Sequence, residues 1–200
     1  MQVFFVRHGQ TDGNLARRHQ HPETPLNDEG KRQVEAVAKR IKALKPTHLI
    51  TSTQLRALES TRIIVEACDL VPETVPAFEE LSRPRSLVGE RYVGLATFWY
   101  AWRWFRGLDL PGGESYAELR QRISDGKAHL ESLPKGSRVV VVSHAVFLSL
   151  FIAHICRSEP LSFIGAVRTF LNIFKVRNAA LIELRYDPIK NGCGWTILRH

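Results

Sequence analysis

Two short runs of apolar residues, at positions 3–6 and 139–142, stand out along the chain. Each run consists of β-prone side chains without a polar face, which is the pattern of a strand buried on both sides of a sheet. Each is closely followed by a histidine, His8 after the first run and His144 after the second. Because functional groups of α/β sheets gather where parallel strands end, we expect the two histidines to share one pocket.

Elsewhere the apolar residues recur three and four positions apart, which is the repeat of a helix with one buried face. The first such helix is expected to begin at Asn27 or Asp28, either of which can cap it, and to end near Leu44 before Pro46. The remaining elements are helices over residues 54–67, 114–133, 145–155 and 160–171, and strands or extended segments over 49–51, 71–76, 180–186 and 195–198, the last two forming an edge hairpin. This alternation predicts a three-layer α/β/α sandwich with a mostly parallel central sheet.

Residues 86–110 contain a dense aromatic stretch with three of the four tryptophans of the chain. At helical spacing, Phe98, Trp102 and Phe105 share one face, which is expected to pack on the core. We interpret the segment as a lid insertion over the pocket mouth, within a single domain that spans residues 1–200. An aromatic lid would favour a substrate with an apolar or planar leaving group, and a role at a membrane surface is a weaker alternative for so short a stretch.

The chain carries a formal net charge of +8, with 28 lysines and arginines against 20 acidic residues. Such an excess suits either nucleic acid or small anions. The basic residues are dispersed and no aromatic-basic nucleic-acid motif occurs, so we favour a phosphorylated small molecule as the partner, with nucleic acid as the less favoured alternative. The oligomeric state is left open.

The three cysteines, Cys68, Cys156 and Cys193, are scattered and odd in number. This pattern argues against a disulfide framework or a zinc site and is typical of a reducing compartment, so we expect a cytoplasmic protein. The sequence also shows no signal peptide after Met1 and no apolar run long enough to span a bilayer, so no membrane partner is expected.

The residues around the first histidine suit phosphate chemistry. Arg7 can bind phosphoryl oxygens through its planar guanidinium, and His8 can attack phosphorus. Gly9 allows the backbone to turn sharply or to approach a ligand. Asn14 can donate an amide hydrogen to a phosphoryl oxygen, although it could instead cap a helix or a turn. One histidine at a strand end is more often structural, but two of them with Arg7 adjacent favour a functional site.

Five sequence elements, in order and over nearly the whole chain, resemble the signature of the histidine phosphatase superfamily, the phosphoglycerate mutase-like enzymes. They are Arg7-His8-Gly9 with Thr11 and Asn14, the Pro-Leu-x-x-x-Gly element at 25–30, the second arginine element at 52–61 with Arg56, the Pro-Gly-Gly-Glu-Ser turn at 111–115, and Val142-Ser143-His144. The chain departs from the family at Ala145, where a glycine usually follows the second histidine, and at His19-Gln20-His21. The two histidines of that second departure have no apparent third ligand, so we expect a loop there rather than a metal site.

The resemblance implies roles for the matching residues. His8 would be the nucleophile that forms a phosphohistidine, while Arg7, Arg56 and His144 would surround the phosphoryl oxygens. Asn14 would be a further phosphate contact. The backbone N–H of Ala145 can also face the anion from a helix N-terminus.

The family also has a carboxylate near the phosphate pocket, which falls on the pair Glu79-Glu80. Lining up the apolar-x-Glu pattern selects Glu80 as the general acid and leaves Glu79 as its outward neighbour. The alternative is that both are solvated acids of a loop. Glu114, after the Gly-Gly turn, is the next candidate.

These assignments predict a metal-independent phosphomonoesterase that acts on a small phosphorylated metabolite. No cofactor or metal ion is expected, because two guanidiniums supply the positive charge that Mg²⁺ supplies elsewhere. A phosphoglycerate mutase-type isomerase and a non-catalytic phosphate-binding module are the alternatives. Mutases of the family tend to be longer, and the aromatic insertion favours a phosphatase.

Overall fold

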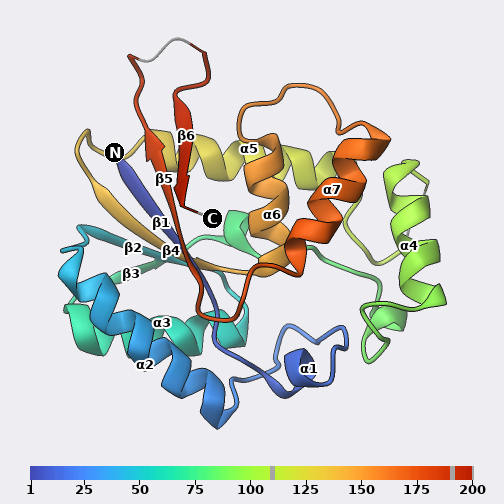
Figure 1. The fold of residues 1–200 in the computed structure, drawn as a ribbon, viewed down its shortest axis with the longest axis horizontal. Helices are drawn as coiled ribbons and strands as arrows, with labels where there is room; N and C mark the ends of the chain where they lie inside the picture. The colour runs from blue at the N-terminus through green and yellow to red at the C-terminus, as the bar shows by residue number, and fades with distance from the viewer. Residues whose placement is uncertain (109–110, 190–191, 200) are drawn as a thin grey trace.

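The structure, a computed structural model, describes residues 1–108, 111–189 and 192–199 (Figure 1). Over this part of the chain, six strands form one sheet in the order β3-β2-β4-β1-β5-β6. Strands β1 to β4 pair in parallel, whereas β5 runs antiparallel to its neighbours β1 and β6. The bounds are Gln2–Arg7 (β1), His48–Thr51 (β2), Pro72–Thr74 (β3), Arg138–Ser143 (β4), Leu181–Tyr186 (β5) and Trp195–Arg199 (β6). The sheet is therefore mostly parallel, with the predicted hairpin at one edge.

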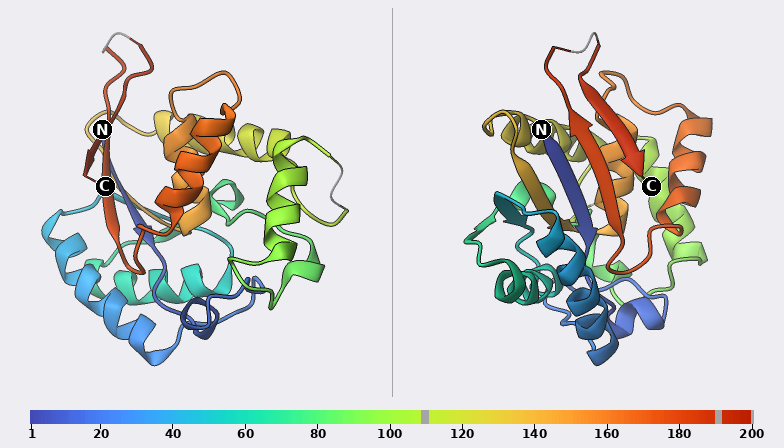
Figure 2. Two further views of the ribbon diagram at one scale, coloured as in Figure 1. Left: turned by 45° about the vertical axis from the view of Figure 1, so that its right-hand side comes forward. Right: turned by 60° about the vertical axis from the view of Figure 1, so that its left-hand side comes forward.

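The five helices predicted from the sequence, here α2, α3, α5, α6 and α7, begin and end within a few residues of the predicted positions, whereas α1 lies in a segment without a predicted helix and α4 had no predicted bounds. Their bounds are Asp12–Leu15 (α1), Asp28–Ala43 (α2), Leu55–Cys68 (α3), Leu95–Phe105 (α4), Tyr116–Glu131 (α5), Ala145–His154 (α6) and Phe163–Ile173 (α7). Helices α4 and α7 lie side by side, and α7 is the nearer of the two to the strands (Figure 1 and Figure 2). Residues 109–110 of the predicted lid and residues 190–191 of the predicted hairpin turn lie outside the described residues.

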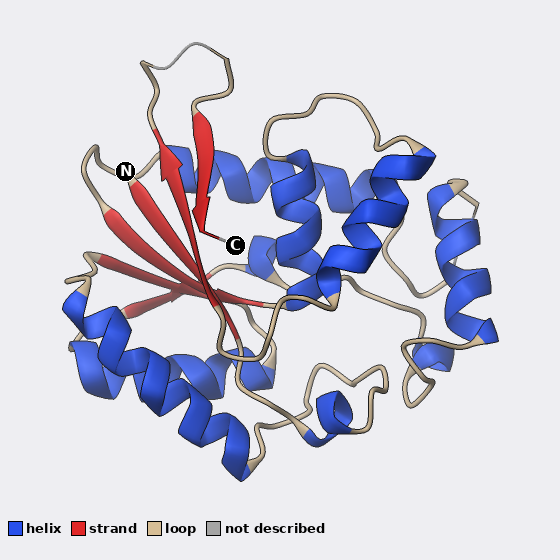
Figure 3. Ribbon diagram, viewed as in Figure 1, coloured by secondary structure: helices blue, strands red, loops and turns tan. Residues whose placement is uncertain are grey.

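Helices cover both faces of the sheet (Figure 3). Successive residues of β1 point to opposite faces, so Phe5 joins a core with α5 and α6, whereas Phe4 and Val6 join a second core with α2 and α3. In β4, Val141 and Val142 divide between the same two cores. This arrangement is the predicted three-layer α/β/α sandwich.

The register of β1 and β4 brings the two histidines to one edge of the sheet. Arg7, the last residue of β1, lies opposite Ser143, the last residue of β4. His8 and His144 each follow one residue later, and the backbone N–H of His8 donates to the carbonyl of Ser143 (3.0 Å). The two strand ends therefore deliver their histidines to the same place, as expected for neighbouring parallel strands.

The turn after β1 packs tightly against the first turn of α2. Asn27 caps α2 by accepting a hydrogen bond from the backbone N–H of Gly30 (2.8 Å). A Cβ atom on Gly9 would lie 2.4 Å from the carbonyl oxygen of Gly30, and one on Gly30 would lie 2.1 Å from that of Gln10. Both glycines are thus required by a close backbone contact. The approach expected at Gly9 is made to α2.

The buried face of α4 differs from the prediction. Phe98 and Trp102, expected on the core, are 61% and 42% exposed, whereas Tyr100 and Trp104 are buried. Nearly every residue of α4 is apolar, so the hydrophobic spacing alone does not select a face. A hydrogen bond favours the observed one, because the indole N–H of Trp104 donates to the carbonyl of Glu114 (2.8 Å).

The prediction that the cysteines form no disulfide is wrong. Cys156, which follows α6, is bonded to Cys193, which precedes β6, and their Cα atoms are 5.3 Å apart. The two lie 37 residues apart in sequence, and the fold brings them together. The cytoplasmic location loses the support of the cysteine pattern and stays a prediction. As a separate observation, none of the helices in the described ranges combines the length and apolarity needed to cross a membrane.

Candidate active site

His8 and His144 lie side by side and are both buried, with ring centroids 5.1 Å apart. The Nδ1–H of His8 donates to the carbonyl of Gly9 (2.7 Å). This bond fixes the tautomer and leaves Nε2 with its lone pair available for attack. Nε2 of His144 is hydrogen-bonded to the hydroxyl of Ser52 (2.8 Å).

Two arginines complete a basic floor, by which we mean Arg7, His8, Arg56 and His144. Arg7 donates from Nη1 to the carbonyl of Val176 (2.5 Å), and Arg56 donates to the carbonyl of His21 (3.2 Å) and to the side chain of Gln54. In the part of the chain that the structure describes, neither guanidinium forms an ion pair, and the Nε atom of each is buried without a hydrogen-bond partner. The carboxylate of Glu80 attracts both guanidiniums without forming an ion pair with either, so the floor keeps buried positive charge that a bound anion would balance.

The environment keeps the histidines uncharged. Burial lowers the pKa of His8 well below its usual value, and the positive charges of Arg56 and Arg7 lower it further. Burial and Arg56 act in the same direction on the pKa of His144. Burial also lowers the pKa of Arg56 to about 10, which leaves its guanidinium charged at neutral pH. The floor therefore combines two neutral imidazoles with permanent cations at pH 7.

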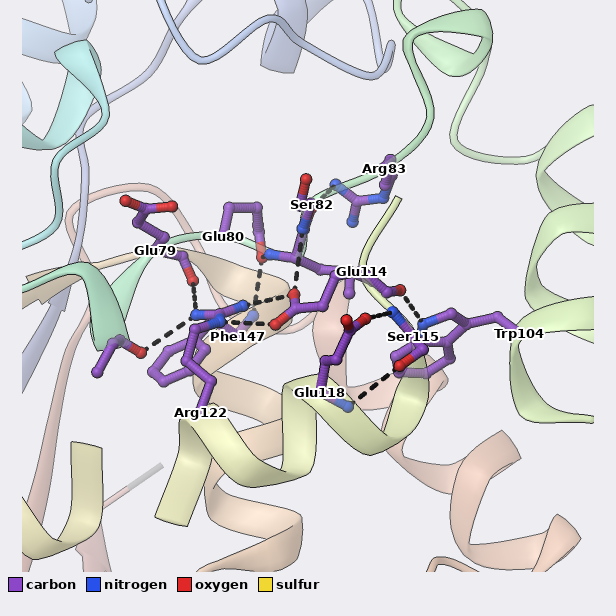
Figure 4. Close-up of polar contacts among 12 residues, drawn as sticks. Glu79, Glu80, Ser82, Arg83, Trp104, Glu114, Ser115, Glu118, Arg122 and Phe147 are labelled. Atoms are coloured by element: carbon purple, nitrogen blue, oxygen red, sulfur yellow. Dashed lines mark hydrogen bonds and ion pairs between the residues drawn. The ribbon is translucent and has the colours of Figure 1, made fainter. Parts of the chain in front are cut away.

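Both carboxylates of the Glu79-Glu80 pair line the cavity above this floor. The carboxylate of Glu80 accepts a hydrogen bond from the backbone N–H of Phe147 (2.9 Å) (Figure 4). It accepts another from the backbone N–H of Val146 (3.3 Å), which also lies at the start of α6. Glu79 accepts one from the hydroxyl of Thr53. Neither residue is a fully solvated loop acid, and Glu79 does not simply face outward.

Arg122 holds the backbone that carries these carboxylates. Its Nη1 donates to the carbonyls of Ala77 (3.1 Å) and Glu79 (2.8 Å), and its Nε and Nη2 each donate to Glu114 (2.7 Å) (Figure 4). Glu114, the next candidate for the acid, is therefore engaged in an ion pair and lies outside the lining of the cavity. Its position indicates that it supports the Glu79-Glu80 segment through Arg122.

Asn14 reaches the cavity as part of a side-chain network. Its amide donates to the hydroxyl of Tyr92 (3.1 Å) and accepts from the amide of Asn178 (2.9 Å), which also donates to the carbonyl of Gly9 (3.2 Å). Sequence reasoning missed Tyr92 and Asn178. Asn178 had a weak signal, because it stands two residues before the first strand of the predicted edge hairpin. Tyr92 had none.

The loop after β1 and the lid segment are joined. The buried ring of His19 is hydrogen-bonded through Nε2 to the hydroxyl of Thr97 (2.9 Å), and its backbone N–H donates to the carbonyl of Glu90 (2.9 Å). The departure His19-Gln20-His21 thus anchors residues 86–97. Within the described ranges, no group of three or more histidine, cysteine or acidic side chains is placed to hold a metal ion.

One cavity of about 1160 Å³ opens over the floor. Of the predicted residues, those that line it are Arg7, His8, Asn14, Arg56, Glu80 and Ala145. His144 lies beneath, against His8. Arg83, which sequence reasoning did not select, also lines the cavity.

The sequence model of the histidine phosphatase superfamily (branch 1) matches residues 3–198. A protein of Yersinia enterocolitica named probable phosphoglycerate mutase GpmB is 34% identical, over 98% of this chain and 91% of its own. One of the same name from Proteus mirabilis is 35% identical, over 76% of this chain and 74% of its own.

Solved structures share the fold. The putative alpha-ribazole-5'-P phosphatase of Escherichia coli superposes with a TM-score of 0.78 at 19% identity, covering 100% of this chain and 96% of its own. The mycobacterial glucosyl-3-phosphoglycerate phosphatase, in complex with VO3, gives 0.75 at 21% identity, covering 99% and 97%. The family model spans both strand-end histidines and every residue of the basic floor, and the predicted resemblance is confirmed. The chain belongs to the histidine phosphatase superfamily, branch 1.

Proposed function

We propose that this chain is a metal-independent phosphomonoesterase that transfers the phosphoryl group of a small phosphorylated metabolite first to His8 and then to water. The observation that carries the proposal is a buried, neutral histidine beside two guanidiniums that form no ion pair within the described residues. A substrate phosphate would supply the missing negative charge. The same cations would stabilise the charge that develops on the phosphoryl oxygens during transfer.

In the first step, Nε2 of His8 attacks phosphorus, the bond from phosphorus to the ester oxygen breaks, and Glu80 gives a proton to the departing alcohol. Arg7, Arg56 and His144 surround the transferring group. In the second step, Glu80 takes a proton from a water molecule whose oxygen attacks the phosphohistidine. Inorganic phosphate leaves, and both His8 and Glu80 return to their starting states.

Asn14 and Ala145 are proposed as further contacts to the phosphoryl group. Both line the cavity, and Ala145 is the first residue of α6, so its N–H lies at a helix N-terminus. Glu80 accepts from the next two amides of that helix. The helix start would thus hold the acid and the phosphate beside each other.

A phosphoglycerate mutase-type transfer is the second candidate, and the names of the sequence relatives favour it. It shares the phosphohistidine with the phosphatase and differs in returning the phosphoryl group to the organic product. A non-catalytic phosphate-binding module would need the two arginines but would have no use for the tautomer that Gly9 imposes on His8.

A panel of phosphorylated metabolites in excess EDTA, scored for released phosphate, tests the proposal. We expect release without added metal. Loss of activity in EDTA that a divalent ion restores would contradict metal independence. Conversion of 3-phosphoglycerate to 2-phosphoglycerate without net release of phosphate would favour the mutase over the phosphatase. Binding of phosphate esters without either reaction would favour the non-catalytic binding module.

A further inference from the structure

The cavity continues from the basic floor into a trough between α4 and α7, the two helices that lie side by side in Figure 2. The lining residues of α4, here called the α4 wall, are Thr97, Tyr100, Ala101, Trp104 and Phe105. The α7 wall consists of Ala166, Thr169, Phe170 and Ile173 of α7 and of Phe174, which directly follows this helix. Both sets recur three and four positions apart, so each helix presents one continuous and mostly apolar stripe to the trough.

The trough and the floor belong to one cavity because α6 connects them. This helix begins directly after His144, and its residues Val146 and Leu150 line the same space. The cavity volume of about 1160 Å³ is large enough for a ligand far bigger than a phosphoryl group. A phosphate on the floor would leave most of this volume, including the trough between the two walls, for the rest of the substrate.

We propose that the substrates are phosphomonoesters of amphiphilic alcohols, with an extended apolar chain that lies between the α4 wall and the α7 wall. This inference rests on the proposed phosphatase function and adds the chemical class of the leaving group. The phosphoryl group would lie on the basic floor, the ester oxygen near Glu80, and the carbon chain between the two helices. Removal of that chain from water would drive binding.

The proposal predicts that activity rises with chain length. For the series ethyl, butyl, hexyl and octyl phosphate, kept below their micelle concentrations, kcat/KM should increase by up to about fourfold per added methylene, the factor that corresponds to about 0.8 kcal/mol. The rise should level off once the chain outgrows the trough. Glycerol phosphate, with a polar leaving group, should be a poorer substrate than butyl phosphate.

Two adjacent residues of α7 provide a matched pair of variants. Phe170 and Leu171 are 39% and 59% exposed, but only Phe170 lines the trough. Phe170→Asn should flatten the dependence of kcat/KM on chain length, whereas Leu171→Asn should keep the wild-type dependence. Ala101→Asn introduces a polar side chain on the opposite wall and should flatten the dependence independently.

The outcomes separate this inference from the proposed function. Turnover of ethyl phosphate with kcat/KM that stays level or falls with chain length would overturn the apolar leaving group and keep the phosphatase. So would an equal effect of Phe170→Asn and Leu171→Asn on the chain-length dependence. If no ester is hydrolysed, the proposed phosphatase function is contradicted, and binding measured by calorimetry then tests whether the trough holds an apolar chain. Octyl phosphate that binds no more tightly than ethyl phosphate would overturn the inference.

Discussion

The basic floor and the α4 wall enclose the same cavity, but different physical features determine them. Each histidine of the floor follows a strand whose neighbours and register are set by buried apolar runs, and its position can be predicted from the end of that run. The α4 wall belongs to a helix that is apolar on nearly every side, and its face is selected by a hydrogen bond from Trp104 to a distant carbonyl. Periodicity therefore locates a side chain only where a polar face contrasts with an apolar one.

The largest expected effect is at the floor. His8→Ala removes the proposed nucleophile and should lower kcat/KM by a factor on the order of 10⁴ or more. An acid quench with labelled substrate should show an acid-labile, base-stable phosphate on the wild type and none on the variant. Labelling of His8→Ala to the wild-type level would contradict the assignment of His8.

Substitution of Trp104 in the α4 wall should lower the stability of the fold. Trp104, only 3% exposed, is packed and hydrogen-bonded, so Trp104→Ala should lower the free energy of unfolding by about 4 kcal/mol. Trp99→Ala, at a position that is 56% exposed on the same helix, should change it by less than about 0.5 kcal/mol. Urea denaturation measures both. Equal effects would mean that α4 buries a different face.

Substitutions of Glu79 and Glu80, the two acids above the floor, should differ in how strongly their effects depend on the leaving group. Glu80→Gln removes the proposed general acid and should slow the pre-steady-state burst on an alkyl phosphate on the order of a hundredfold. The effect on p-nitrophenyl phosphate should be much smaller, because that leaving group needs little protonation. Glu79→Gln is the matched control and should show no such difference. If Glu79→Gln shows the dependence instead, the choice between the adjacent carboxylates is wrong.

Acid should destabilise the fold through its buried histidines. Burial lowers the pKa of His19 and of His154 to about 4, compared with an ordinary value near 6.5 in the unfolded chain. As pH falls below 6.5, these histidines become protonated in the unfolded state but stay neutral in the folded state. The free energy of unfolding is therefore fully retained above pH 6.5 and decreases as the pH approaches 4. Between pH 7 and 5.5 these two groups should reduce the free energy of unfolding by about 2 kcal/mol. His8 and His144 act in the same direction.

Urea denaturation at several pH values tests this linkage. Replacing His19 by Gln should reduce the loss of stability between pH 7 and 5.5, since one of the groups that must charge is gone. A wild-type free energy of unfolding that is constant over this interval would contradict the shifted pKa values.

The smallest effect is expected at Tyr100. Its hydroxyl is buried without a hydrogen-bond partner among the residues that the structure describes, and burial raises its pKa to about 12, so it stays protonated. Tyr100→Phe should leave the free energy of unfolding unchanged or raise it by up to about 1 kcal/mol. In contrast, Tyr116→Phe removes a hydroxyl that is bonded to His154 and to the N–H of Leu161 (2.9 Å each) and should destabilise by about 1 kcal/mol. Destabilisation by Tyr100→Phe would reveal a partner for its hydroxyl.

The sequence was sufficient to predict the sandwich, the positions of α2, α3, α5, α6 and α7, and the meeting of His8 and His144, because these follow from local periodicity and from the geometry of parallel strands. Arg56 and Glu80 were selected with the help of the family resemblance. The role of Arg122 and the hydrogen bonds of Asn178 could not be predicted, since both depend on carbonyl groups that only the folded chain places within reach. The pairing of Cys156 with Cys193 was missed for the same reason.

The position of β1 in the sheet has a consequence for how the protein folds. β1 lies between β4 and β5, so both of its neighbours come from the second half of the chain. Arg7 also needs the carbonyl of Val176, which lies 169 residues further along. Contacts so distant in sequence require large loops to close first, which makes folding slow. During synthesis on the ribosome, the Arg-His-Gly segment therefore emerges well before β4, Val176 and β5, and its contacts with them can form only after those segments have followed.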